Sequence, residues 1–149
     1  MARLVIFLDI DGVLAPIRRW DRYGDVDPSC VQVLNDIVAQ ADAEVVVSST
    51  WRHGKTVAEL QAILEASGFA GRVLDKTPTG SPGMDRGDEI AAWLAHHAID
   101  GYVIIDDHGN MGALRHRLVQ THPSQGLRPG DVPRAVAVLA RPISGRSLG

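Results

Sequence analysis

Cysteine, aromatic residues and long apolar runs are all scarce in this sequence. Cys30 is the only cysteine among the 149 residues, so an internal disulfide is excluded. No apolar run approaches the roughly 20 residues that a membrane-spanning helix needs. The first apolar run is cut short by Asp9 and Asp11, which does not match the apolar core of a secretory signal peptide. These absences predict a cytoplasmic protein that does not contact a membrane.

The chain also lacks a strong excess of charge of either sign. Its formal net charge is −3, so it has no global attraction for nucleic acid or for an anionic membrane. Any contact of that kind requires a local basic patch. A length of 149 residues suits a single domain with a full hydrophobic core. We therefore predict one domain over residues 1–143 and a flexible tail over residues 144–149.

Two kinds of apolar pattern alternate along the chain. Short runs rich in Val, Ile and Leu predict strands near residues 3–8, 44–47, 73–74, 102–105 and 118–120. Apolar residues at helical spacing predict helices that begin near residues 28, 57, 86 and 131, with a short helical turn at 112–116. Strands that alternate with helices of this length are typical of βαβ units. The predicted fold is α/β, a Rossmann-like three-layer sandwich with a mostly parallel central sheet.

Capping residues support three of these helix starts. Asp27 precedes Pro28, and proline is well suited to the first position of a helix. Thr56 and Glu59 have the spacing of a capping box. Asp131 is expected to cap the last helix, because it directly precedes the last apolar segment with helical spacing.

Two aspartates directly follow the first predicted strand. Asp9 and Asp11 are one residue apart and are followed by Gly12, with no basic residue nearby in the sequence. Two carboxylates so close repel each other, so they need a nearby cation or a raised pKa. They are either simple turn residues or part of a site, and ligand sites in open α/β sheets lie at the carboxyl ends of strands.

Polar residues also follow two other predicted strands. Ser48 and Ser49 follow the second strand, Asp106 and Asp107 follow the strand near residues 102–105, and Arg86 opens the helix between them. Carboxylates from two strands can hold Mg²⁺. One carboxylate can attack phosphorus and a second can act as acid and base, while a hydroxyl and a cation stabilise the phosphoryl oxygens. The alternatives are local: the serines or the aspartates cap turns, and Arg86 is solvated.

The four motifs in this order resemble those of the haloacid dehalogenase (HAD) superfamily of phosphatases. Residues 7–13 read Phe-Leu-Asp-Ile-Asp-Gly-Val, Ser48 follows three valines, Arg86 precedes the last acidic strand, and Asp106-Asp107 end it. Three further segments point to one subgroup of this superfamily: Val-Ser-Ser-Thr-Trp-Arg, Tyr-Val-Ile-Ile-Asp-Asp and the late Gln-Thr-x-x-x-x-Gly-Leu. They resemble the capless HAD domain of Swiss Army Knife RNA-repair proteins, over the chain to about residue 139.

This resemblance implies a role for each motif residue. Asp9 would be the nucleophile and Asp11 the general acid and base, with Ser48 on a phosphoryl oxygen. Arg86 would neutralise the developing charge, with Lys76 as the alternative cation. Mg²⁺ would be held by Asp9, by Asp11 through its backbone carbonyl, and by Asp106 or Asp107. Further contacts to substrate are expected from Gly12, Ser49 and Arg52.

The spacing of the motifs leaves no room for a separate cap domain, either between Asp11 and Ser48 or between Ser48 and Arg86. An uncovered site encloses little of a small substrate. We therefore predict a Mg²⁺-dependent phosphomonoesterase that acts on a macromolecular phosphate, such as an RNA or DNA end. The alternatives are a non-catalytic phosphate-binding domain and a small-molecule or nucleotide phosphatase. The basic and aromatic residues at 18–23 either grip a nucleic-acid backbone or form a solvated loop.

Overall fold

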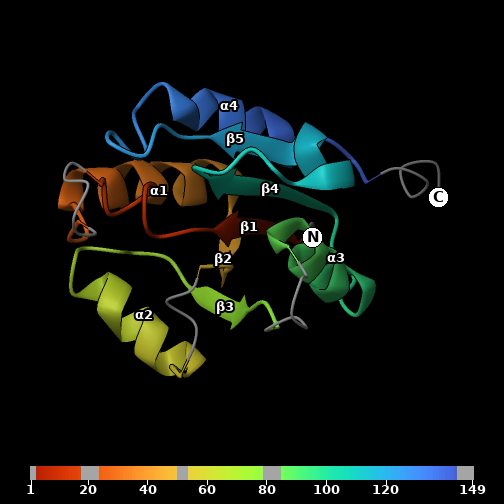
Figure 1. Ribbon diagram of the computed structural model, residues 1–149, viewed down its shortest axis with the longest axis horizontal. Coiled ribbons are helices and arrows are strands. Elements are labelled where there is room, and N and C mark those ends of the chain that lie inside the picture. The colour runs from red at the N-terminus through yellow and green to blue at the C-terminus, as the bar shows by residue number, and fades with distance from the viewer. Residues whose placement is uncertain (1–2, 18–23, 50–53, 79–84, 144–149) are drawn as a thin grey trace.

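A five-stranded parallel sheet lies at the centre of the structure (Figure 1). The computed structural model describes residues 3–17, 24–49, 54–78 and 85–143. The strands are β1 (Leu4–Leu8), β2 (Ala43–Val47), β3 (Val73–Lys76), β4 (Gly101–Asp106) and β5 (Leu118–Gln120). Their order across the sheet is β3-β2-β1-β4-β5, and all four pairings are parallel. The predicted α/β fold is confirmed, and the sheet is parallel throughout rather than mostly so.

Helices cover both faces of this sheet and make it the middle of three layers. On one face, α1 (Pro28–Ala41), α2 (Val57–Glu65) and α4 (Asp131–Leu139) bury their apolar residues. On the other face, α3 (Arg86–Ala95) and the short 3-10 helix η2 (Gly112–Arg117) pack on a second core. In that second core Phe7 meets Trp93 and Tyr102 edge to face, with ring centroids 5.4 and 5.7 Å apart. Each inner strand therefore contributes apolar side chains to both faces, as the continuous apolar runs predict.

The register of the three middle strands places their carboxyl ends side by side. Leu8 of β1 pairs with Val47 of β2 and with Ile105 of β4. The pairing continues one residue further, since Ser48 N donates to Leu8 O at 2.9 Å and Asp9 N donates to Ile105 O at 3.0 Å. The polar residues that follow each strand are thus brought to one edge of the sheet, as the sequence predicts.

The helix starts follow the capping residues with one exception. Asp27 accepts a hydrogen bond from Ser29 N, and Thr56 forms the expected capping box with Glu59. The prediction for α4 is wrong by one position, because the N-cap is Gly130 and Asp131 is the first helical residue. Asp131 instead accepts from the main chain of Arg128 and from the side chain of Arg134, so its carboxylate is already occupied beside the helix start.

The described residues contain no additional domain inserted between the site motifs. Between β1 and β2 they hold a loop and α1, and between β2 and α3 they hold α2 and β3. No described helix is long and apolar enough to cross a membrane. The expected tail at 144–149 lies outside the described residues, so it stays a prediction.

Candidate active site

The turn after β1 holds Asp9 at the centre of the sheet edge. Asp9 is only 3% exposed, and its Oδ1 accepts from Ile10 N at 2.9 Å, which fixes the orientation of the carboxylate. The chain then reverses tightly, because Ile10 O accepts hydrogen bonds from three successive amides, those of residues 13, 14 and 15. Asp11 lies in this turn and is half-buried.

Gly12 is required by the backbone of this turn and by its surroundings. Its φ of +79° lies in the left-handed region, which is unfavourable for residues that have a Cβ. A Cβ at this position would also collide with the carboxylate of Asp107. The two motifs therefore meet closely here, with the backbone of the first against the side chain of the last.

Arg86 lies against two of the predicted acidic residues. It is the first residue of α3, whose start is held by a capping box between Asp85 and Asp88. Its Nη1 lies 2.6 Å from Asp106 Oδ2 and 3.3 Å from Asp9 Oδ2, and the side chain is 19% exposed. Burial alone lowers the pKa of Arg86, but the charges of Asp106 and Asp9 outweigh it and raise the pKa above its ordinary value. The guanidinium is therefore permanently charged at the end of two adjacent strands.

Lys76, the alternative cation in the sequence, occupies a different position. It is the last residue of β3, and its Nζ donates to Lys55 O at 2.6 Å. Arg86, by contrast, contacts two of the predicted acidic residues directly. The geometry therefore favours Arg86 as the cation of this cluster.

Acidic groups outnumber basic groups in the described part of this cluster. Among the described residues, Asp9, Asp106 and Asp107 bring three carboxyl groups to this edge, and Arg86 brings one guanidinium. Burial, followed by the charge of Asp106, raises the pKa of Asp9 to about 8, although Arg86 pulls it back. Burial also raises the pKa of Asp106. A second cation at this edge would relieve both shifts, because it would favour the ionised forms.

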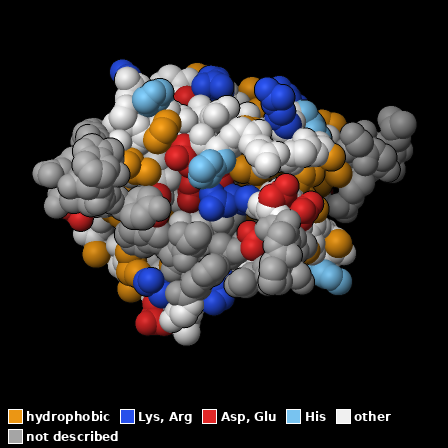
Figure 2. Space-filling model, in the orientation of Figure 1, with side chains coloured by type: hydrophobic (Ala, Val, Ile, Leu, Met, Phe, Trp, Pro, Cys, Tyr) orange, Lys and Arg blue, Asp and Glu red, His pale blue; other side chains and the backbone are white. Residues whose placement is uncertain are grey.

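The oxygen atoms of the cluster fit a magnesium ion. Asp107 Oδ1 is buried, and no group among the described residues donates a hydrogen bond to it. Ligand atoms of Asp106, Asp107 and His108 lie within 4.8 Å of one another. Carboxylate oxygens are the ligands that Mg²⁺ prefers. In Figure 2, acidic side chains lie beside a Lys or Arg side chain and a His side chain near the middle of this face.

The contacts of Asp106 test the alternative explanation that this residue only caps a turn. Its Oδ1 accepts from His108 N at 3.0 Å, which is a local turn bond of that kind. Its Oδ2, however, is bound to Arg86, twenty residues away in the sequence. The carboxylate thus serves the turn with one oxygen and the cluster with the other. The His108 side chain is 71% exposed, with Nε2 3.9 Å from Asp107 Oδ1.

The serines after β2 lie at the same edge but are fully buried. Ser48 and Ser49 are each 0% exposed. No described residue forms a hydrogen bond with Ser48 Oγ, which is buried. Arg52 and the basic and aromatic residues at 18–23 lie outside the described residues, so their predicted contacts stay predictions.

Sequence reasoning assigned no role to Thr121, which contacts two parts of the site. Its Oγ1 donates to Gly12 O at 2.7 Å, and its N donates to Asp106 O at 3.0 Å. Thr121 belongs to the late Gln-Thr segment that marked the resemblance, and this was the available signal. The role was missed because the residue is 109 positions from Gly12 and carries no charge.

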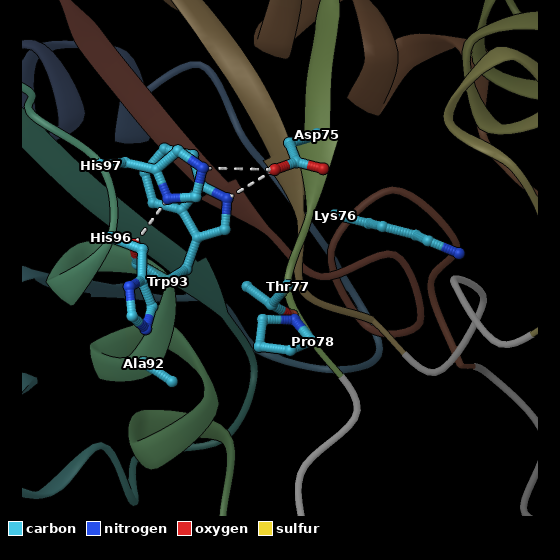
Figure 3. Close-up of a pocket in the computed structure, with 8 residues that line it drawn as sticks. All are labelled: Asp75, Lys76, Thr77, Pro78, Ala92, Trp93, His96 and His97. Carbon is cyan, nitrogen blue, oxygen red and sulfur yellow. Dashed lines mark hydrogen bonds and ion pairs between the residues drawn. The ribbon is translucent and has the colours of Figure 1, made fainter.

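A separate cavity of about 370 Å³ lies beside the edge strand β3 (Figure 3). Trp93 Nε1 donates to Asp75 Oδ2 at 2.8 Å, and the ring of His97 stacks on Trp93 with centroids 3.8 Å apart. In Figure 3 the side chain of Lys76 extends away from Trp93 and His97. The lining residues are Asp75, Lys76, Thr77, Pro78, Ala92, Trp93, His96 and His97. None of them belongs to the acidic cluster.

Comparison with known proteins gives one family. Residues 5–132 match the model of the family described as the HAD domain in Swiss Army Knife RNA repair proteins. This span includes all four motifs, from Asp9 to Asp107, as well as Thr121. A search of the curated proteins gives no match.

Proposed function

The chain belongs to the family of HAD domains in Swiss Army Knife RNA repair proteins, and we propose that it is a Mg²⁺-dependent phosphomonoesterase acting on a nucleic-acid end. The observation that carries the proposal is the contact of one guanidinium, Arg86, with the two buried carboxylates Asp9 and Asp106. Such a cluster suits the transfer of a phosphoryl group, whose charge must be balanced while bonds to phosphorus change.

Asp9 is the nucleophile of the proposed reaction. One of its carboxylate oxygens attacks phosphorus, and the bond from phosphorus to the ester oxygen breaks as the leaving group departs. Asp11 gives a proton to that oxygen, so the substrate leaves as an alcohol. A water then attacks phosphorus and passes its proton to Asp11. The bond between phosphorus and Asp9 breaks, and inorganic phosphate leaves.

The other residues of the edge bind and orient the phosphoryl group. Arg86 is already charged and its Nη1 lies 3.3 Å from Asp9 Oδ2, so its charge is close to where the equatorial oxygens of the phosphoryl group would lie. The buried Ser48 hydroxyl is able to donate to one of these oxygens. The ionised form of Asp9 is the one that attacks, so the raised pKa of this group must be lowered in the working enzyme.

The carboxylates of Asp9, Asp106 and Asp107 would hold Mg²⁺, together with the Asp11 carbonyl that the resemblance implies. When bound, the ion supplies the missing positive charge and polarises a phosphoryl oxygen. Oxygen donors, the excess of acidic over basic groups and the buried Asp107 Oδ1 without a donor among the described residues all support this assignment.

The substrate proposal has two supports. The described residues place no inserted domain over this edge of the sheet, which favours a phosphate carried on a large molecule. The family is described from RNA repair proteins, and a repair reaction requires ends with a defined phosphorylation state. We therefore propose a terminal phosphate of RNA or DNA as the substrate.

The activity is tested with p-nitrophenyl phosphate. The wild type is expected to release phosphate with Mg²⁺ present and to stop when EDTA is added. Asp9→Asn is expected to abolish turnover, whereas Asp36→Asn, at an exposed aspartate of α1, leaves it unchanged. If wild type and Asp9→Asn show equal turnover that EDTA does not inhibit, the proposed enzymatic function is wrong. The alternative of a non-catalytic phosphate-binding domain would then remain.

The substrate class is tested separately with a panel. It holds 5′- and 3′-phosphorylated RNA and DNA oligonucleotides, phosphopeptides and mononucleotides. Higher kcat/KM on the oligonucleotides than on the other members supports the proposal. Faster hydrolysis of mononucleotides or phosphopeptides would contradict the nucleic-acid end while leaving the phosphatase chemistry standing.

A further inference from the structure

A segment that follows β5 lies along the loop that carries the proposed nucleophile. Leu127 N donates to Val13 O at 2.8 Å, and Ile17 N donates to Pro123 O at 2.7 Å. Thr121 Oγ1 completes the row by donating to Gly12 O at 2.7 Å. Residues 121–127 therefore brace residues 12–17 through both main-chain and side-chain hydrogen bonds, although the two segments are more than a hundred positions apart.

Thr121 differs from the rest of this brace because it joins two motifs. Its N–H donates to Asp106 O at 3.0 Å, which continues the pairing of β4 with β5. Its hydroxyl donates to Gly12 O, in the turn after β1. The residue is 5% exposed, so water competes little for either bond. Thr121 thus ties the end of β4, through its main chain, to the Asp9–Gly12 turn, through its side chain.

Gly12 is the position in this turn that most needs an external restraint. Its φ of +79° is accessible to glycine because there is no Cβ, and glycine has no side chain whose packing could hold the backbone in that conformation. A larger residue cannot restrict it, because a Cβ would strike Asp107. The available restraints are hydrogen bonds, and Gly12 has them from N–H to Ala15 O at 2.9 Å and from Thr121 to its C=O.

We propose that Thr121 is a positioning residue for phosphoryl transfer. Its hydroxyl fixes the peptide plane that follows Gly12, and through it the direction of Asp11 and the fit of Gly12 against Asp107. The inference rests on the proposed function where it concerns catalysis, since Asp11 must face the leaving oxygen. Loss of a hydrogen bond that orients a reacting group in this way lowers activity by roughly 10-fold to 100-fold.

The kinetic test compares two substitutions of the same residue. Thr121→Val keeps the shape and removes the hydroxyl, and Thr121→Ser keeps the hydroxyl. With p-nitrophenyl phosphate, kcat of Thr121→Val is expected to fall roughly 10-fold or more with KM little changed, and Thr121→Ser is expected to recover most of it. Ser124→Ala is the control, because it removes a hydroxyl in the same segment that contacts His122. Equal kcat in Thr121→Val and wild type, or an equal loss in both Thr121 variants, would overturn the proposal.

A second measurement does not depend on activity. Hydrogen–deuterium exchange of the amides at residues 12–15 reports the order of the turn, since all four are hydrogen-bonded within it. Faster exchange is expected in Thr121→Val and wild-type exchange in Thr121→Ser and Ser124→Ala. If the wild type lacks phosphatase activity but this pattern appears, the proposed function fails and the restraint on Gly12 stands. Unchanged exchange in Thr121→Val would refute the restraint itself.

Discussion

Arg86 Nη1 lies 2.6 Å from Asp106 Oδ2, and this ion pair joins the first residue of α3 to the last residue of β4. The same nitrogen is 3.3 Å from Asp9, so the guanidinium spans the ends of β1 and β4. An arginine at a helix N-terminus opposes the helix dipole. The two buried carboxylates supply the compensating charge, and the position is explained by the cluster rather than by the helix.

Removal of this guanidinium is expected to abolish most of the activity. Arg86→Ala removes the guanidinium that contacts Asp9 and Asp106 and raises the pKa of Asp9 further, because Arg86 lowers it in the wild type. We expect kcat/KM to fall by about 10² to 10³. Arg86→Lys retains the positive charge but loses the planar guanidinium, so its kcat/KM is expected to lie between those of Arg86→Ala and the wild type. Arg115→Ala, at an exposed arginine, is the control. If kcat/KM of Arg86→Ala equals that of the wild type, the assignment of Arg86 to the catalytic site is wrong.

The pKa of Asp9 predicts how stability depends on pH without metal. The folded value is about 8 against an ordinary 3.8, so between these values the folded state binds more protons than the unfolded state. Stability therefore falls as pH rises through this window. In EDTA, thermal unfolding is expected to show a lower Tm near pH 8 than near pH 5. Asp9→Asn removes this contribution and should flatten the profile.

Magnesium is expected to act in the opposite direction. The ion competes with protons for the same carboxylates, so it binds more strongly as pH rises. The increase in Tm on addition of Mg²⁺ is therefore expected to be larger near pH 8 than near pH 5, and to be lost in Asp107→Asn. An equal increase at both pH values would contradict a site built from Asp9.

The sequence was sufficient for the fold and for the acidic edge, for physical reasons that are local. An apolar run such as residues 4–8 specifies a buried strand, and parallel pairing then forces Asp9, Ser48 and Asp106 to one edge. The sequence left Arg86 and Lys76 as alternatives, because both lie upstream of β4 and their directions depend on packing. Thr121 was missed because its role depends on a contact between distant segments, and a threonine after a strand has no special local signal.

The Asp131 prediction failed for a similar reason. Aspartate before an apolar helical segment is a good N-cap, and the sequence shows nothing against it. In the structure Asp131 Oδ2 accepts from Arg128 N at 3.0 Å and Oδ1 from Arg134 Nη1 at 3.1 Å. These bonds stabilise the turn before α4 with Asp131 one position inside the helix. Boundaries of this kind are decided by competing partners of one carboxylate.

Arg117 is expected to stabilise the fold without serving the site. Its guanidinium donates to four carbonyl oxygens, those of Tyr102, Val138, Arg141 and Pro142, at 2.9 to 3.2 Å. Arg117→Ala leaves these acceptors without their charged donor and is expected to cost about 3 kcal/mol in the free energy of unfolding. Urea denaturation measures this loss. Activity per folded molecule should stay at the wild-type level, and a selective loss of kcat would contradict a purely structural role.

Substitutions at Gly12 and Gly54 distinguish the cost of backbone strain from the cost of a steric clash with Asp107. Gly12→Ala and Gly54→Ala place a side chain at similar φ angles, +79° and +72°. A Cβ at Gly54 meets no heavy atom within 4 Å, so its cost is the left-handed backbone alone, about 1 to 2 kcal/mol. A Cβ at Gly12 also strikes Asp107. Urea denaturation should therefore show a larger loss in Gly12→Ala than in Gly54→Ala.

The same pair also tests the link between the two motifs. If the clash displaces Asp107, the rise in Tm on adding Mg²⁺ should shrink in Gly12→Ala and persist in Gly54→Ala. Loss of stability with a normal response to Mg²⁺ would mean that the turn yields while Asp107 keeps its place. Because both variants carry the same added methyl group, a difference between them comes from where that methyl group points.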